Sequence, residues 1–214
     1  MTPIELKCLE ELINISFGSG VAVVADMMDS KARLHLPDVK VVSPAELLLV
    51  LNERIKLSSS RLMATSQHFF GEMDGEILFL IDQFSVTNMI RHLNHLPMET
   101  QISGPELLDP VLEVGNILSA TCLKRLAEML EFNVAFTRPS VEFLPELGLA
   151  TEDNSRYWDE RGKVILVNTE LDFKEEKIWG SLYLSLEPAS YKIFSARLKA
   201  YSSALEVWIC LDIP

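Results

Sequence analysis

The sequence has few cysteines, few basic residues and no long apolar run. Its three cysteines, Cys8, Cys122 and Cys210, are widely separated and have no Cys-x-x-Cys spacing. This usage is typical of reduced thiols in a cytoplasmic protein and excludes a disulfide framework. Lys and Arg number 19 against 31 Asp and Glu, and the resulting net charge of −12 argues against a nucleic-acid partner.

The longest apolar runs, such as residues 77–81, are far shorter than the roughly 20 residues that span a bilayer. An acidic residue already occurs at Glu5, which argues against a signal peptide. We therefore expect a cytoplasmic protein without membrane insertion. Its 48% hydrophobic residues provide enough apolar material for a sizeable core.

The sequence also lacks a nucleophile elbow, a P-loop, a dinucleotide-binding fingerprint and zinc-type spacing of Cys and His. His92 and His95 lie three residues apart, but no further ligand is near them in the sequence, so we interpret them as a solvated helix end. The acidic residues at 170–176 lack the glycine and the closing glutamate of an EF-hand loop. We expect no metal site of the chain's own.

The two halves of the chain repeat one another. A glutamate, an asparagine and a proline each recur 102 residues later, as Glu11 and Glu113, Asn14 and Asn116, and Pro37 and Pro139. A period of about half the chain indicates a duplicated unit rather than a solenoid. We predict a single domain, residues 1–214, made of two repeats at about 2–98 and 103–205.

The repeated residues share one face of a predicted helix. A helix advances about 100° per residue, so Asp109 and Asn116 lie close to the angular position of Glu113. Apolar residues such as Val111 and Leu118 lie on the opposite side, with Gly115 beside them. The same arithmetic groups Lys7, Glu11 and Asn14 in the first repeat. Each helix is expected to present an acid and an amide to solvent.

The remaining patterns predict an α+β fold with an antiparallel sheet of about six strands packed against the long helices. The long helices are expected to begin at the capping signals Thr2-Pro3-Ile4-Glu5 and Ser103-Gly104-Pro105-Glu106 and to end near 30 and 131. Further helices are expected at 44–51, 85–95 and 190–204. The predicted strands are 34–42, 62–71, 75–82, 141–144, 164–173 and 179–186. Two hairpins are expected among them, with turns at 72–75 and 174–177. Residues 146–156 are predicted as a short helix or loop, and residues 206–213 as an extended tail.

Neither an exposed glutamate nor an asparagine is a strong base or nucleophile near neutral pH. An amide can, however, hold a water by donating and accepting hydrogen bonds, and a carboxylate can bind a lysine of a partner. This pair suits a reaction whose other components lie on another protein. Phosphoryl transfer is such a reaction, because its catalysis is mainly positioning and charge stabilisation.

The spacing D/S-x3-E-x2-N-x22-P resembles the signature of the CheC/CheX/FliY phosphatases of bacterial chemotaxis, and two copies in one chain most resemble CheC. The second repeat matches in full, at Asp109, Glu113, Asn116 and Pro139. The first repeat matches except at Lys7, where the pattern has Asp or Ser. The resemblance covers nearly the whole chain and implies a pseudo-two-fold α/β sandwich.

The resemblance implies that the chain dephosphorylates the aspartyl phosphate of a CheY-type response regulator. Asn116 and Asn14 would orient the attacking water, and Glu113 and Glu11 would bind the lysine of the regulator. Asp109 would belong to the binding surface. Mg2+ would be held by the regulator, so the chain would need no cofactor of its own.

Two alternatives remain open. The chain could be an adaptor that binds a response regulator or the receptor deamidase CheD, another partner of the family, without hydrolysis; Lys7 and the acidic composition motivate this alternative. It could instead be a component of the flagellar switch. The second is less favoured, since a separate switch domain is not expected after the last helix.

Overall fold

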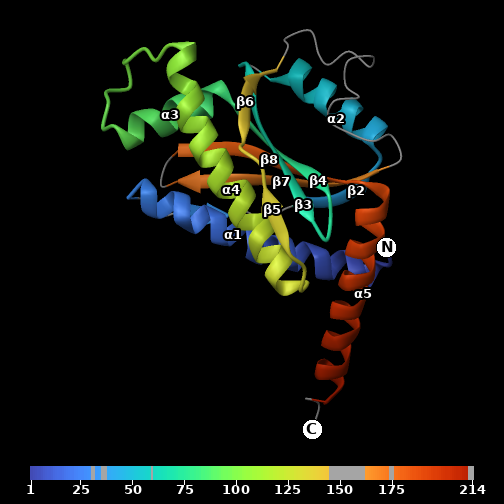
Figure 1. The fold of residues 1–214 in the computed structure, drawn as a ribbon. Helices are drawn as coiled ribbons and strands as arrows, with labels where there is room; N and C mark the ends of the chain where they lie inside the picture. Colours follow the sequence, from blue (N-terminus) through green and yellow to red (C-terminus); the bar gives the residue numbers. More distant parts are fainter. Residues whose placement is uncertain (30–31, 35–37, 59, 145–161, 174–175, 212–214) are drawn as a thin grey trace.

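The structure, a computed structural model, describes residues 1–29, 32–34, 38–58, 60–144, 162–173 and 176–211 (Figure 1). The predicted turn residues 174–175, the helix or loop at 146–156 and Pro37 lie outside these ranges.

Two long helices pack side by side on one face of the sheet (Figure 1). Helix α1 is Pro3–Met27, with Thr2 as its N-cap in a capping box with Glu5. Helix α4 is Leu108–Met129 and follows a 3-10 turn, Gly104–Leu107. Both helices were predicted from these capping signals, which satisfy backbone N–H groups that have no partner within the helix.

Helix α1 has the length and the hydropathy of a membrane span, with a mean of 1.4 over its most apolar window. More than half of this window, 56%, is buried inside the protein. The apolar side chains Leu9, Ile13 and Phe17 belong to the core that α1 shares with α4 and the sheet. Burial in a core accounts for their apolar character.

The described part of the chain has three further α-helices: α2 (Pro44–Leu57), α3 (Gln83–Leu93) and α5 (Pro188–Leu211). The prediction of an extended tail at 206–213 was wrong, because α5 continues through Leu211. No Gly or Pro follows Pro188 within the helix, so nothing in the sequence ends it at 204. The apolar run 207–211 has too short a pattern to distinguish strand from helix.

The sheet is antiparallel, and its described strands number eight rather than the predicted six or so. The strands are β1 (Ala32–Leu34), β2 (Asp38–Val42), β3 (Leu62–Gly71), β4 (Gly75–Asp82), β5 (Val134–Phe136), β6 (Ser140–Phe143), β7 (Lys163–Phe173) and β8 (Glu176–Leu186). The difference arises at the two outer positions: the predicted strand 34–42 is two short strands, β1 and β2, and β5 was not predicted. The α+β class is confirmed.

The outer strands cross between the two halves of the chain. Strands β1 and β2 pair with β7, whereas β5 and β6 pair with β3. The hairpins β3–β4 and β7–β8 meet at the centre through β4 and β8. Each hairpin thus receives its outer neighbours from the other half of the chain. The exact repeat boundaries, 2–98 and 103–205, stay a prediction.

The two faces of the sheet are covered differently. Alternate strand residues such as Met63, Phe79 and Val167 form the larger core with α1 and α4. The intervening residues, including Leu78 and Leu166, pack with α2 in a smaller core on the opposite face (Figure 1). The long helices therefore lie on one face of the sheet, and the outward surface of that layer carries the repeated motif.

A half-buried carboxylate lies on the α2 side of the sheet. Burial raises the pKa of Glu76, although the hydrogen bond from Ser66 and the nearby His68 oppose this shift. Because the folded pKa exceeds the unfolded one, ionised Glu76 destabilises the native state at neutral pH. We expect Glu76→Gln to raise Tm near pH 8, and this gain to shrink as the pH falls towards about 5.

Thermal unfolding followed by circular dichroism over this pH range would test the prediction. The matched control is Glu53→Gln, which neutralises an exposed glutamate of α2 and should leave Tm nearly unchanged. A gain that does not depend on pH would contradict the assignment of the effect to the ionisation of Glu76.

Candidate functional site

The repeated motif of the second half occupies the outward face of α4. Asp109 and Glu113 are exposed, and Asn116 is partly exposed. The opposite side of the helix is buried in the larger core, through Val111 and Leu118 among others. The predicted division into a polar and an apolar face is therefore present in the structure, and an acid and an amide lie within one helical turn.

The first motif has the same arrangement on α1. Glu11 and Lys7 are exposed, Asn14 is partly exposed, and Ile13 beside it is buried. Lys7 thus occupies the place that Asp109 has on α4, since the two are 102 residues apart. The motif-bearing faces of α4 and α1 therefore differ in charge at this position, with an anion on α4 and a cation on α1.

Glycines bring the helices close to their neighbours. A Cβ at Gly115 would lie 2.2 Å from Thr65 Oγ1 on β3, so α4 can sit at this distance from the strand only without a side chain there. At Gly20 of α1, a Cβ would lie 3.3 Å from the Cα of Leu118 on α4. The backbones of α1 and α4 therefore approach each other closely at Gly20. Gly115 directly precedes Asn116, so the close packing at Gly115 sets the distance between Asn116 and β3.

A residue of the sheet, which the sequence analysis missed, contacts the second motif. Gln67 of β3 is 5% exposed, and its Nε2 donates hydrogen bonds to Asn116 Oδ1 (3.2 Å) and to the carbonyl oxygen of Thr137 (2.9 Å). A signal for it existed in the sequence. Strand alternation places Thr65 and Gln67 on the same face as Met63, which puts two polar residues on an otherwise apolar, helix-facing side.

No protein-family model matches the sequence, but solved structures do match the fold. FliY from Thermotoga maritima has a TM-score of 0.68 at 16% identity, covering 95% of this chain and 98% of that chain. A chain of the FliG–FliM complex from H. pylori has a TM-score of 0.59 at 12% identity, covering 92% and 100%. CheX from Desulfovibrio desulfuricans has a TM-score of 0.50 at 16% identity, covering 82% and 99%. The chain has the CheC/CheX/FliY fold.

In this CheC-like fold the proline of the second motif lies at a break in an outer strand. Pro139 separates β5 from β6 and directly precedes the first residue of β6. Proline lacks an N–H group and is suited to such a strand start. The neighbouring Thr137 N–H bonds to the carbonyl oxygen of His68 on β3, at 2.9 Å. Pro139 thus lies in the same break between β5 and β6 as Thr137, whose carbonyl oxygen accepts a hydrogen bond from Gln67.

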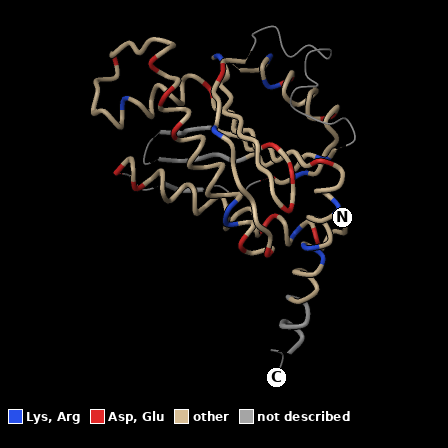
Figure 2. Tube along the Cα trace, in the orientation of Figure 1, with Lys and Arg blue, Asp and Glu red and all other residues tan. Residues whose placement is uncertain are grey.

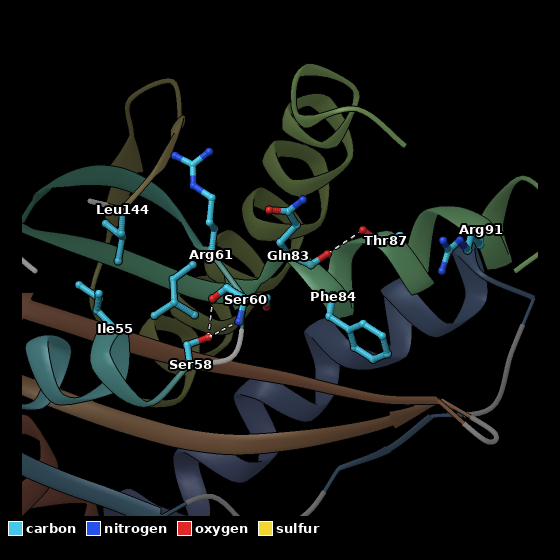
Figure 3. Close-up of a pocket in the computed structure, with 10 residues that line it drawn as sticks. Ile55, Ser58, Ser60, Arg61, Gln83, Phe84, Thr87, Arg91 and Leu144 are labelled. Carbon is cyan, nitrogen blue, oxygen red and sulfur yellow. Dashed lines mark hydrogen bonds between the residues drawn. The ribbon is translucent and has the colours of Figure 1, made fainter. Parts of the chain in front are cut away.

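A cavity of about 700 Å3 lies elsewhere in the CheC-like fold (Figure 3). It is formed between the end of α2, the start of β3 and one side of α3, and Arg61 and Phe84 are among its lining residues. None of the motif residues lines it. The motifs instead lie on exposed helix faces, an arrangement that suits insertion into the active site of another protein rather than enclosure of a small substrate.

The described cysteines do not offer an alternative nucleophile. Cys8 and Cys122 are free thiols. Burial raises the pKa of Cys122 to about 12 and also raises the pKa of Cys8. A thiol with a raised pKa is scarcely ionised at neutral pH and therefore reacts slowly. Cys210 lies where the side chains are not described.

The second motif carries two acids, whereas the first carries one acid and the cation Lys7. Figure 2 shows acidic positions on several elements, among them α1 and α4. On α4 the exposed acids Asp109 and Glu113 precede the amide of Asn116, whereas the basic residues Lys124 and Arg125 come later in the helix. A partner with a lysine at the centre of its docking surface would complement this face.

Proposed function

We propose that the chain is a phosphatase that hydrolyses the aspartyl phosphate of a CheY-type response regulator in the cytoplasm. The observation that supports the proposal most directly is the presence of two outward-facing pairs, Glu11 with Asn14 and Glu113 with Asn116, on the adjacent long helices of a CheC-like fold. Neither pair lines either of two cavities found in the described part of the chain.

In this mechanism each helix face docks on the phosphorylated regulator. The amide of Asn116 or Asn14 accepts a hydrogen bond from a water, so that a lone pair of this water points at the phosphorus atom. The water oxygen forms a bond to phosphorus as the bond to the aspartyl oxygen breaks. The products are inorganic phosphate and the free carboxylate, and the proton lost by the water passes to phosphate or solvent.

The glutamates bind rather than react. Glu113 or Glu11 would form an ion pair with the active-site lysine of the regulator, and Asp109 would extend the acidic surface on α4. The Mg2+ that neutralises the phosphoryl charge would be held by the regulator. Lys7 places a cation beside the first pair, so docking there should be weaker.

Phosphate release would test the proposal. A CheY-type regulator from the same genome is phosphorylated with radiolabelled phosphoryl donor, and loss of label is followed with and without the chain in Mg2+ buffer. We expect catalytic amounts of the chain to accelerate the loss. Tight binding to the phosphorylated regulator without acceleration would instead favour the adaptor function, and binding to CheD would extend it.

Substitution of Glu113 separates docking from chemistry. We expect Glu113→Gln, made in an Asn14→Ala background, to lower kcat/KM about tenfold, mainly through KM, because the ion pair with the regulator is lost. The loss should be smaller at high salt, where the ion pair is screened. The matched control is Glu53→Gln on α2, on the other side of the sheet. A fall in kcat at unchanged KM would contradict a docking role.

A component of the flagellar switch is the second candidate, and the likeness to a chain of the FliG–FliM complex favours it. Such a component should assemble with other copies or with a FliG-type partner. Sedimentation of the purified chain, alone and with FliG from the same genome, distinguishes the two functions. A stable large assembly without phosphate release would support the switch function.

A further inference from the structure

Hydrogen bonds determine which way the amide of Asn116 faces. The carbonyl oxygen of Thr137 can only accept, so the group of Gln67 that lies 2.9 Å from it must be the amide nitrogen. This nitrogen can only donate, so the atom of Asn116 that lies 3.2 Å from it must be Oδ1. The network thus assigns both amides without reference to any ligand.

The assigned orientation leaves the reactive part of Asn116 available. Its Oδ1 accepts one hydrogen bond from Gln67 and keeps a second lone pair, and among the described residues its Nδ2 group donates no hydrogen bond. A side-chain amide on an exposed helix would otherwise rotate between two orientations of similar energy. A fixed amide avoids loss of that freedom when a water is bound.

We propose that Gln67 is a positioning residue that holds the carboxamide of Asn116 in the orientation needed to direct water onto the phosphoryl group. This inference rests on the proposed function and extends it to a residue outside the repeated motif. Gln67 is suited to the role because its backbone is paired with Ile77 of β4, and β3 is paired on its other side by β6 before Gln67 and by β5 after it.

A contribution to folding stability does not explain why residue 67 is polar. Its Oε1 is buried and has no hydrogen-bond partner among the described residues. An unpaired buried acceptor destabilises the folded state. An apolar residue would avoid this loss on a strand face that also carries Met63 and Phe69 of the larger core. A role through Asn116 accounts for the presence of an amide there.

The first motif is supported differently. In the other half of the sheet, strand β7 has the position that corresponds to β3. Its described helix-facing residues, Ile165 and Val167, are apolar and buried. Within the described part of the chain, no hydrogen bond joins Asn14 to another side chain. The amide of Asn14 therefore lacks the restraint that Gln67 gives to Asn116.

This difference provides an internal control for the test. Gln67→Met, which keeps the length of the side chain and removes its amide, is made in two backgrounds. The Asn14→Ala background retains the second site alone, and the Asn116→Ala background retains the first. Phosphate release from the phosphorylated regulator is measured in each, with Tm as a check of folding. Gln83→Met, at the cavity of Figure 3, is the matched control.

We expect Gln67→Met to lower kcat at least tenfold in the Asn14→Ala background, with KM changed less than twofold, and to change nothing in the Asn116→Ala background. An equal loss in both backgrounds would show a structural effect and overturn the proposal. Unchanged kcat in the Asn14→Ala background would overturn it as well.

A second readout does not depend on catalysis. The side-chain amide resonances of Asn116, identified by their loss in Asn116→Ala, should shift in Gln67→Met, whereas those of Asn14 should not. If the unsubstituted chain released no phosphate, the proposed function and the catalytic role of Gln67 would both fail. In that case the shift of the Asn116 amide resonances would still test whether Gln67 holds Asn116. Failure of this contact can therefore be distinguished from failure of the proposed function.

Discussion

Replacing both Asn14 and Asn116 by alanine should lower kcat for phosphate release from a phosphorylated CheY-type regulator about a hundredfold. Each amide would contact the reacting water, so its removal raises the energy of the transition state rather than weakening the docked complex. KM should change little, because Glu11 and Glu113 remain. The measurement is the initial rate of phosphate release against regulator concentration.

The single variants should not be equivalent. Asn116→Ala should remove most of the turnover and Asn14→Ala only a minor part, because Gln67 holds Asn116 while Lys7 opposes docking at the first site. Asn94→Ala is the matched control, since among the described residues the side chain of Asn94 bonds to the Ile90 carbonyl of the adjoining helix α3 and to nothing else. Wild-type turnover by the double variant would rule out water orientation by these amides.

Elements with strong local signals were predicted closely from the sequence. The hairpin strands 62–71 and 75–82 have the predicted ends, because Gly75 and the polar turn before it mark a reversal of the chain. The start of α1 followed from Thr2 and Glu5, whose hydrogen bonds are both present. The outward position of Glu113 and Asn116 followed from the period of the helix.

Features that depend on distant residues were not predictable in this way. The pairing of β2 with β7 joins residues more than a hundred positions apart, and no local pattern encodes it. The contact of Gln67 with Asn116 links a strand to a helix of the other half. Polar residues on an apolar strand face could have drawn attention to Gln67, but its partners emerge only from the fold.

Gly115→Ala should destabilise the protein by about 1–2 kcal/mol and strongly reduce turnover at the second site. A Cβ at Gly115 would lie 2.2 Å from Oγ1, 2.6 Å from Cγ2 and 2.9 Å from Cβ of Thr65, which is 2% exposed. Rotation of the Thr65 side chain moves the first two atoms but not Cβ. Helix α4 must therefore move away from β3 and carry Asn116 away from Gln67.

An exposed glycine within a helix would behave in the opposite way, since alanine there adds about 1 kcal/mol of helix propensity. A gain in the free energy of unfolding, measured with urea, would therefore contradict the packing argument. Gly20→Ala is a graded comparison, because its Cβ would lie 3.3 Å from Leu118 and require a smaller shift. Thr65→Ala combined with Gly115→Ala removes the two closest atoms, so the double variant should recover part of both stability and turnover.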